Sequence, residues 1–531
     1  MNAPPSAPIT AWTPLREPTF RMLWLVSVTA NICLWMNDVA AAWLMTSLTK
    51  SPSLVALVQT ASALPMFLLG LPSGALADIL DRRNYFMATQ IWVAFTAAIL
   101  SVVAFFNLLN APLLIAFVFV NSIGLAMRFP VYAAIVPELV PRAQLASAMA
   151  LNAVAMNLSR VVGPLVAGLI IANLGDEYVF ALNFVMSVAA AFAIASWKRE
   201  RKASVLPGER FIGAMRLGLQ YVRQSQGMRN ALVRSTGFFM HSAAPLALMP
   251  LVARGLGGGA GTYTLLLSAL GIGAIIAVSF LPRLRSRWNL DQVSGIGSMI
   301  HAAGIIGLCF APNAALGAAA MFVAGGGWIL AANSIGISAQ LALPDWVRAR
   351  GMAIFQMSIM GSSALGAFIW GHVAEWTGVP ASLGIAGVSM LVTLALVRVR
   401  RLEIQPEDHV PTHPFQEPVP ARPIELDEGP VMITIEYLVD TGRAPEFASV
   451  MAQSRSARMR HGAVSWGLFE DLERPGRFVE YFATETWADF LRRYDRFTAA
   501  DERLHNERLS FHTGDGPPRI SRYLARNPSF K

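Results

Sequence analysis

Long apolar runs recur along the first 400 residues of the chain, separated by short polar segments. Each run holds roughly 20 residues, the length at which an α-helix crosses a lipid bilayer. Lipid offers no partner to an unpaired backbone N–H or C=O group, so a spanning run must be helical. The pattern therefore predicts an all-α polytopic membrane protein with twelve transmembrane helices, at about 20–46, 53–76, 85–107, 112–135, 144–172, 177–197, 230–253, 262–282, 292–310, 314–342, 351–376 and 380–398.

A weak internal repeat divides the twelve runs into two groups of six. The segment VPELVPRAQLASAMA (136–150) reappears as LPDWVRARGMA (343–353), and GPLVAG (163–168) has a loose counterpart in GAFIWG (366–371). Parallel repeats of this kind are known in transporters. The predicted boundaries are a cytoplasmic N-terminal segment at 1–18, a first six-helix half at 19–197, a basic loop at 198–229 and a second half at 230–400.

The pattern changes after residue 401, where a linker rich in proline and acidic residues covers 401–429. From Val431 apolar and polar residues alternate, which predicts a β-strand. The order that follows, β-α-β-β-α-β, is typical of a small ferredoxin-like α+β domain, here at 430–525. We expect strands at 431–439, 464–471, 478–484 and 519–524, and helices at 444–460 and 487–504.

The composition excludes several protein classes. Of the 531 residues 54% are hydrophobic and 14% are charged, whereas soluble domains carry about 25% charged residues. A disordered, fibrous or ordinary cytosolic protein is therefore excluded. Residues 1–401 hold 26 Lys and Arg against 12 Asp and Glu, whereas 402–531 hold 16 against 21. Because the basic excess lies in the membrane part, it gives no indication of nucleic-acid binding.

The loop charges predict the orientation of the chain. Most Lys and Arg residues of the membrane part fall on one side, with Lys50 and Arg254 on the other. The positive-inside rule then places both termini in the cytoplasm. The two cysteines, Cys33 and Cys309, lie inside apolar runs and form no disulfide framework. No residue spacing marks a metal site, so we expect neither a metal nor a cofactor.

The segment GALADILDRRN (74–84), after the second run, combines small residues, acids and paired arginines at a helix end. It resembles the loop motif of the major facilitator superfamily, although Ile79 and Asp81 depart from the common form. The longer stretches WMNDVAAAWLMTSLTKSPSLVALVQTASALP, FPVYAAIVPELVPRAQLASAMALN and NLSRVVGPLVAGLI resemble the branch that includes the enterobactin exporter and the transmembrane secretion effectors. This resemblance covers nearly all of 15–400.

The resemblance implies transport by alternating access. In the superfamily the loop acid and its arginine partners hold the cytoplasmic gate shut, which implies this role for Asp78, Arg82 and Arg83, with Gly74 allowing close packing. The alternative is that both arginines are only topology signals. GPLVAG resembles a shortened antiporter motif, in which Gly163, Pro164 and Gly168 permit close helix packing and bending.

Three charged residues lie well away from the ends of the runs: Asp38, Arg128 and Arg160. A charge at the bilayer centre costs roughly 2.5–3.5 kcal/mol on insertion scales, so these side chains should face a cavity or one another. Asp38 is the candidate proton carrier, unless it lies solvated near the outer interface. Each arginine binds an anion or forms a structural ion pair. Further pathway candidates, each with interhelical hydrogen bonding as the alternative, are Asn31, Asn157, His241 and Asn333.

The C-terminal domain resembles the antibiotic-biosynthesis-monooxygenase type. Related domains include cofactor-free oxygenases and haem-degrading enzymes, but aromatic residues in a small sheet domain usually belong to its core. A dimerisation or ligand-sensing module is the alternative to catalysis. The residues concerned are His461, Trp466, Trp487, His505, Asn506 and His512.

These observations predict a transporter and not an enzyme. The leading hypothesis is proton-coupled export of a small organic molecule, such as a siderophore, an antibiotic or another amphipathic metabolite, across a bacterial cytoplasmic (inner) membrane. The alternatives are an uptake symporter and a membrane-anchored sensor or enzyme that acts through the C-terminal domain. The expected partners are substrate, protons and lipid, with self-association through the C-terminal domain. The sequence shows no nucleotide-binding motif, so it does not indicate ATP as the energy source.

Overall fold

The computed structural model describes residues 12–197, 211–398 and 422–526, together with the single positions 10, 401, 402, 412 and 420. The chain forms two compact units. The first, here the membrane unit, comprises Met1–Leu206, Leu232–Gly336 and Ala353–Arg401. The second, here the C-terminal unit, comprises Pro207–Ala231, Ile337–Met352 and Leu402–Lys531. The linker predicted at 401–429 lies largely outside the described residues.

Among the described residues, twelve helices are long and apolar enough to cross a membrane, which confirms the predicted number. Several begin at proline, whose fixed φ suits the first turn. The helices are α1 (Pro18–Leu48), α2 (Pro52–Ile79), α3 (Arg82–Phe105), α4 (Ala111–Leu139), α5 (Leu145–Asn173), α6 (Asp176–Ser196), α8 (Gln226–Gly255), α9 (Ala260–Arg285), α10 (Leu290–Cys309), α11 (Ala314–Leu341), α12 (Asp345–Thr377) and α13 (Val379–Val397).

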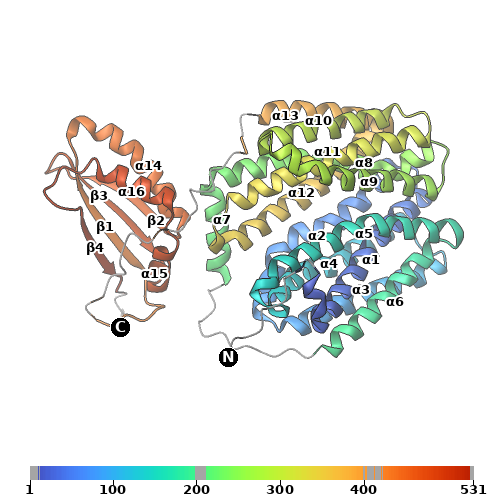
Figure 1. Cartoon of the computed structure of the whole chain (residues 1–531), viewed down its shortest axis with the longest axis horizontal. Helices are drawn as coiled ribbons and strands as arrows, with labels where there is room; N and C mark the ends of the chain where they lie inside the picture. The colour runs from blue at the N-terminus through green and yellow to red at the C-terminus, as the bar shows by residue number, and fades with distance from the viewer. Residues whose placement is uncertain are drawn as a thin grey trace. The chain divides into compact units, whose positions relative to one another are not determined.

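The helices of each half pack side by side in the membrane unit (Figure 1). In the first half α2 packs on α4, α3 on α6 and α1 on α5, and in the second half α10 packs on α13. Small residues allow close approach, because a Cβ on Gly304 would lie 2.7 Å from the backbone nitrogen of Ala324. Large apolar side chains such as Phe95 and Phe192 are exposed, as expected of a surface that faces lipid.

Helix α7 (Phe211–Gln224) lies within 198–229, the segment that the charge pattern assigns to a basic loop. Its buried residues Leu217 and Tyr221 are spaced by four, so they share one face of the helix. Arg216 and Arg223 are exposed. Helix α7 belongs to the C-terminal unit, where it packs against α14 (Ala444–Arg460).

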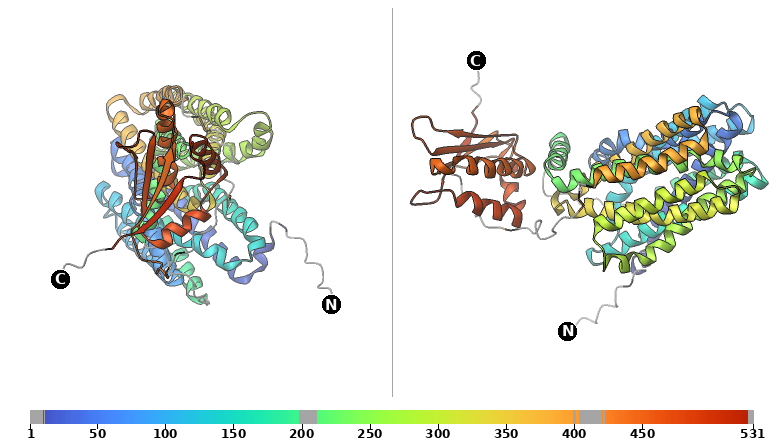
Figure 2. Two further views of the ribbon diagram at one scale, coloured as in Figure 1. Left: turned by 90° about the vertical axis from the view of Figure 1, so that its left-hand side faces the viewer. Right: turned by 90° about the horizontal axis from the view of Figure 1, so that it is seen from above.

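The rest of the C-terminal unit is an α+β fold in which helices cover one face of an antiparallel sheet (Figure 2). The strand order is β2-β3-β1-β4. The helix predicted at 487–504 is two helices, because Thr498 and Asp501 form a capping box that starts a new one. The elements are β1 (Val431–Leu438), α14 (Ala444–Arg460), β2 (Ser465–Glu470), β3 (Arg477–Thr484), α15 (Trp487–Asp495), α16 (Ala499–Leu509) and β4 (Arg519–Leu524).

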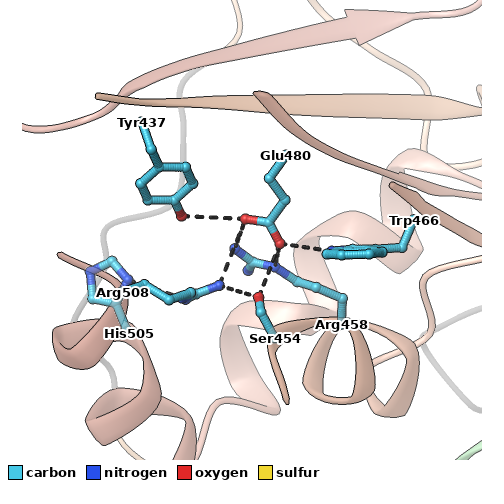
Figure 3. A network of polar contacts seen from close by, with 7 residues as sticks. All are labelled: Tyr437, Ser454, Arg458, Trp466, Glu480, His505 and Arg508. Carbon is cyan, nitrogen blue, oxygen red and sulfur yellow. Dashed lines mark hydrogen bonds and ion pairs between the residues drawn. The ribbon is translucent and has the colours of Figure 1, made fainter. Parts of the chain in front are cut away.

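Glu480 lies fully buried on the face of β3 that meets the helices (Figure 3). Arg458 of α14 donates to both of its carboxylate oxygens, at 3.1 and 3.2 Å. Trp466 Nε1 at 3.0 Å and Ser454 Oγ at 3.1 Å also donate to Glu480. Trp466 and His505, candidate functional residues in the sequence, thus lie in or beside a structural network, since His505 contacts Arg508 of the same cluster.

The electrostatics of this network favour an ionised Glu480. Burial acts to raise the pKa of Glu480, but the guanidinium of Arg458 and the nearby Arg508 outweigh it and lower the pKa to about 2. Because the pKa in the folded state lies below the ordinary value of 4.5, the stabilisation is complete above that value. It is lost as the pH falls towards about 2.

We predict that Glu480→Gln destabilises the C-terminal fold by about 3 kcal/mol, because it leaves buried guanidiniums without their counter-charge. Hydrogen exchange of the amides of β1 and β3 in the full-length protein should accelerate by about a hundredfold. Glu473→Gln, in the exposed turn before β3, is the matched control and should change nothing. Unaltered protection in Glu480→Gln would contradict a stabilising role for the carboxylate.

Candidate functional site

The charged residues predicted for the pathway, Asp38, Arg128 and Arg160, lie away from the ends of their helices. Asn31, Trp35 and Asp38 follow one another at i, i+4 and i+7 along α1, so they share one face of that helix. Each of them contacts a different neighbouring helix. This face of α1 is therefore the element around which the candidate site is built.

Asp38 accepts a hydrogen bond from Ser62 Oγ of α2, at 3.0 Å. Among the described residues it forms no ion pair, so its carboxylate is not joined to Arg128 or Arg160. In sequence, every other carboxylate of the twelve helices lies close to a helix end. Asp38 is thus an acid inside the membrane unit whose one direct hydrogen-bond donor is a neutral hydroxyl.

Arg128 of α4 is 4% exposed and donates to Asn31 Oδ1 at 2.8 Å. The structure therefore joins two predicted pathway residues from different helices. Because an α-helix rises about 1.5 Å per residue, Asp38 lies about 10 Å further along α1 than Asn31. The arginine and the carboxylate occupy separate levels of the bundle.

Arg160 of α5 lies between two tryptophans. Its guanidinium carbon is 5.4 Å from the ring centre of Trp35 in α1 and 4.5 Å from that of Trp328 in α11. Cation–π attraction stabilises such an arrangement. The Nε atoms of Arg160 and Trp35 are buried without a hydrogen-bond partner. The cluster joins the two halves and presents donors that an acceptor group would satisfy.

The other polar candidates make local contacts. Asn157 donates to Ala153 O at 2.8 Å, within its own helix. His241 Nδ1 lies 2.6 Å from Gly237 O, and the imidazole is 5.6 Å from the ring of Trp370. Asn333 accepts a hydrogen bond from Arg285, near the end of α9. Among the described residues, no hydrogen bond or ion pair joins these three residues to Asp38 or Arg160.

The arginines of the predicted gate contact other helices. Arg82 forms an ion pair with Glu138 of α4 at 2.7 Å, and Arg83 donates to the backbone at the end of α6. The side chain of Asp78 lies outside the described residues. A Cβ added to Gly74 would meet no atom within 4 Å. No described neighbour requires a glycine here in this conformation, and the packing role of Gly74 stays a prediction.

The glycines of GPLVAG do face other helices. A Cβ on Gly163 would lie 2.5 Å from Trp35 Cβ, and one on Gly168 would collide with Thr264 of α9. Pro164 lies inside helix α5. Because Gly168 and Thr264 belong to opposite halves, this glycine sets how closely α5 approaches α9.

Sequence reasoning missed a hydrogen-bonded contact between the halves at the other end of the bundle. Glu375 of α12 accepts from Ser51 Oγ at 2.7 Å and from Ser53 Oγ at 2.8 Å, both at the start of α2. Arg254 of α8 donates to Ser47 Oγ of α1 at 2.7 Å. The sequence signal for this contact is an acidic residue, Glu375, and a basic residue, Arg254, each near the end of an apolar run.

The model of the transmembrane secretion effector family matches residues 9–529. Macrolide efflux protein A of Streptococcus pyogenes is 26% identical over 238 residues, which cover 44% of this chain and 58% of that protein. The chain thus matches less than two thirds of that relative. The staphyloferrin A transporter of Staphylococcus aureus is 20% identical over 389 residues, or 71% of this chain and 95% of that protein.

Solved structures of transporters share the fold of the membrane helices. A nucleoside transporter has a TM-score of 0.56 at 12% identity, covering 72% of this chain and 99% of that one. A D-xylose–proton symporter has a TM-score of 0.54 at 13% identity, covering 71% and 97%. The match of the family model over most of the chain leads to one conclusion: the chain belongs to the transmembrane secretion effector family of the major facilitator superfamily.

Proposed function

We propose that this protein exports a small amphipathic organic molecule in exchange for protons. The observation that carries the proposal is the cluster of Arg160, Trp35 and Trp328 in the middle of the membrane unit. Two aromatic rings suit an apolar or planar substrate body, and the guanidinium suits an acceptor or anionic group. The names of the relatives, a macrolide efflux protein and a siderophore transporter, support this substrate class and its direction.

Asp38 supplies the proton coupling in this proposal. A carrier must take up a proton in one conformation and release it in another, so its surroundings must change as the halves move. Asp38 is suited to this role because it forms no ion pair among the described residues and its direct hydrogen-bond donor is Ser62. Its position on the α1 face that also carries Trp35 links proton binding to the substrate cluster.

Two gates close the pathway in the proposed cycle. The segment of Asp78, Arg82 and Arg83 is the cytoplasmic gate, and the contacts of its arginines with α4 and α6 anchor this segment to the first half. Glu375 with Ser51 and Ser53 closes the opposite end, because these hydrogen bonds must break before the halves separate there. Alternating access requires that the two gates open in turn, never together.

The protein lies in a bacterial cytoplasmic membrane with both termini inside, as the loop charges favour. Self-association through the C-terminal unit is part of the proposal. The outward face of its sheet carries exposed apolar side chains, among them Met432, Leu438 and Tyr523. Such a face suits a second copy of the same domain.

We predict that Asp38→Asn abolishes transport driven by a pH gradient, because an amide cannot carry a proton, while substrate binding persists. Uptake of a labelled macrolide and of staphyloferrin A into everted vesicles measures transport. Equilibrium binding of the same probes to purified protein measures substrate binding. Asp176→Asn, at the start of α6, is the matched control. If Asp38→Asn vesicles accumulate either probe at the parent rate, Asp38 is not the carrier.

We predict that Arg160→Gln weakens binding of a transported probe by about tenfold, because the amide neither carries charge nor stacks between two tryptophans. Arg160→Lys should retain part of the affinity, since it keeps the charge but loses the planar group. Arg283→Gln, at an exposed position near the end of α9, is the control. If Arg160→Gln and the parent bind the probe with equal affinity, the cluster does not contact the substrate.

The orientation predicts the activity of reporter fusions. Green fluorescent protein after Lys531 should fluoresce and alkaline phosphatase there should be inactive, because the C-terminus is cytoplasmic. Alkaline phosphatase inserted after Lys50, between α1 and α2, should be active. The reverse pair of results would invert the proposed topology and both gate assignments.

A further inference from the structure

The C-terminal unit contains a partly open cavity of about 190 Å³. Its walls come from three segments that are distant in sequence: the end of α7 with Tyr221, the first turn of α12 with Trp346 and the connection before it, and the α+β fold. The α+β fold contributes Arg460, His461 and Asp501 among others. The cavity holds more than a single water and is smaller than the roughly 300 Å³ of the smallest drug-sized pockets.

Aromatic and cationic groups hold the walls together. The rings of Tyr221 and Trp346 meet edge to face with their centres 5.6 Å apart, and Tyr221 donates to Ala342 O at 3.3 Å. On its other side Trp346 carries the guanidinium of Arg496 at 4.6 Å from the ring centre. Arg496 in turn donates to His461 O at 3.3 Å. A planar ring and a cation therefore adjoin the same space.

The charges around the cavity are predominantly positive. Asp501 contacts Arg460 at 3.5 Å and His461 Nε2 at 3.1 Å, and accepts from Thr498 Oγ1 at 2.6 Å. Burial lowers the pKa of His461 although Asp501 opposes the shift, so the imidazole is neutral at pH 7. The wall thus holds the guanidiniums of Arg460 and Arg496 against one carboxylate.

The interior behind the wall adds further positive charge. Arg458, Arg493 and Arg508 lie around Glu480, and the Nε atoms of Arg493 and Arg508 are buried without a hydrogen-bond partner. At the cavity itself Trp346 Nε1 is a buried donor that also has no partner. An unsatisfied buried donor is costly, and an acceptor in the cavity would remove that cost.

We propose that this cavity binds a small aromatic carboxylate, whose anionic group meets Arg460 and Trp346 Nε1 while its ring lies against Tyr221 and Trp346. Arginine is the residue best suited to a carboxylate, because its planar fork presents parallel donors. The site is separate from the proposed transport pathway. Helices α8 and α12 continue the chain from these walls into the membrane unit.

Benzoate is the probe for this site, with benzamide as its neutral counterpart and inorganic phosphate as an anion without a ring. Isothermal titration of the full-length protein in detergent should show one benzoate site, with benzamide bound at least about tenfold more weakly. If phosphate binds and benzoate does not, the ligand is not an aromatic carboxylate. Absence of benzoate binding at millimolar concentration would overturn the site itself.

Variants locate the binding within the chain. Arg460→Gln should weaken benzoate binding by about tenfold, and Trp346→Phe, which removes only the donor and keeps a ring, by about threefold. Arg455→Gln, on an exposed position of α14 away from the cavity, is the matched control and should bind as the parent does. Hydrogen exchange of the β-strands tests that each variant is folded.

Two further outcomes separate this site from the transport pathway. Benzoate affinity unaffected by both Arg460→Gln and Trp346→Phe would place binding elsewhere and contradict the proposal. Asp38→Asn protein should bind benzoate like the parent, because the site is independent of proton coupling. The proposed function can therefore fail in the vesicle assay while this site is confirmed, and the reverse result is equally distinguishable.

Discussion

The cost of placing charge inside a lipid bilayer governs where this protein keeps its polar groups. A charged side chain at the bilayer centre costs roughly 2.5–3.5 kcal/mol on insertion scales, so the twelve helices hold few of them. A hydrogen bond to Asn31 offsets part of this cost for Arg128. For Arg160, cation–π contacts with Trp35 and Trp328 do the same. Neither arginine uses the carboxylate of Asp38, which leaves that acid available for a proton.

The C-terminal unit also removes charges from water, but it does so inside a protein core. It buries several arginines with Glu480 and Asp501, and stabilises them by charge-assisted hydrogen bonds rather than by excluding them. Such a network is worth keeping only if each member is satisfied, because removing one partner leaves the others buried and unpaired. Trp346 Nε1 has no hydrogen-bond partner within the chain, and the proposed carboxylate would supply one.

Hydropathy predicted the architecture because the length of an apolar run and the period of its apolar residues can be read from a single segment. The twelve spans and the β-α-β-β-α-β order depend on apolar runs of sufficient length and on alternation, and both could be derived without tertiary information. Helix α7 escaped prediction because its few apolar residues gain a partner only when α14 is folded. The tryptophans around Arg160 escaped for the same reason, since Trp35 and Trp328 are 293 positions apart and ordinary members of apolar runs.

Helix α1 gives the proposed coupling between proton and substrate a physical basis. Asn31, Trp35 and Asp38 on its one face contact Arg128, Arg160 and Ser62 on three other helices. A rigid helix cannot move one of these side chains without moving the others, so a shift that alters the surroundings of Asp38 also alters the Arg160 cluster. Coupling free energy is reciprocal. A substrate that favours one arrangement of α1 must therefore change the proton affinity of Asp38 by the same factor by which the proton changes substrate affinity.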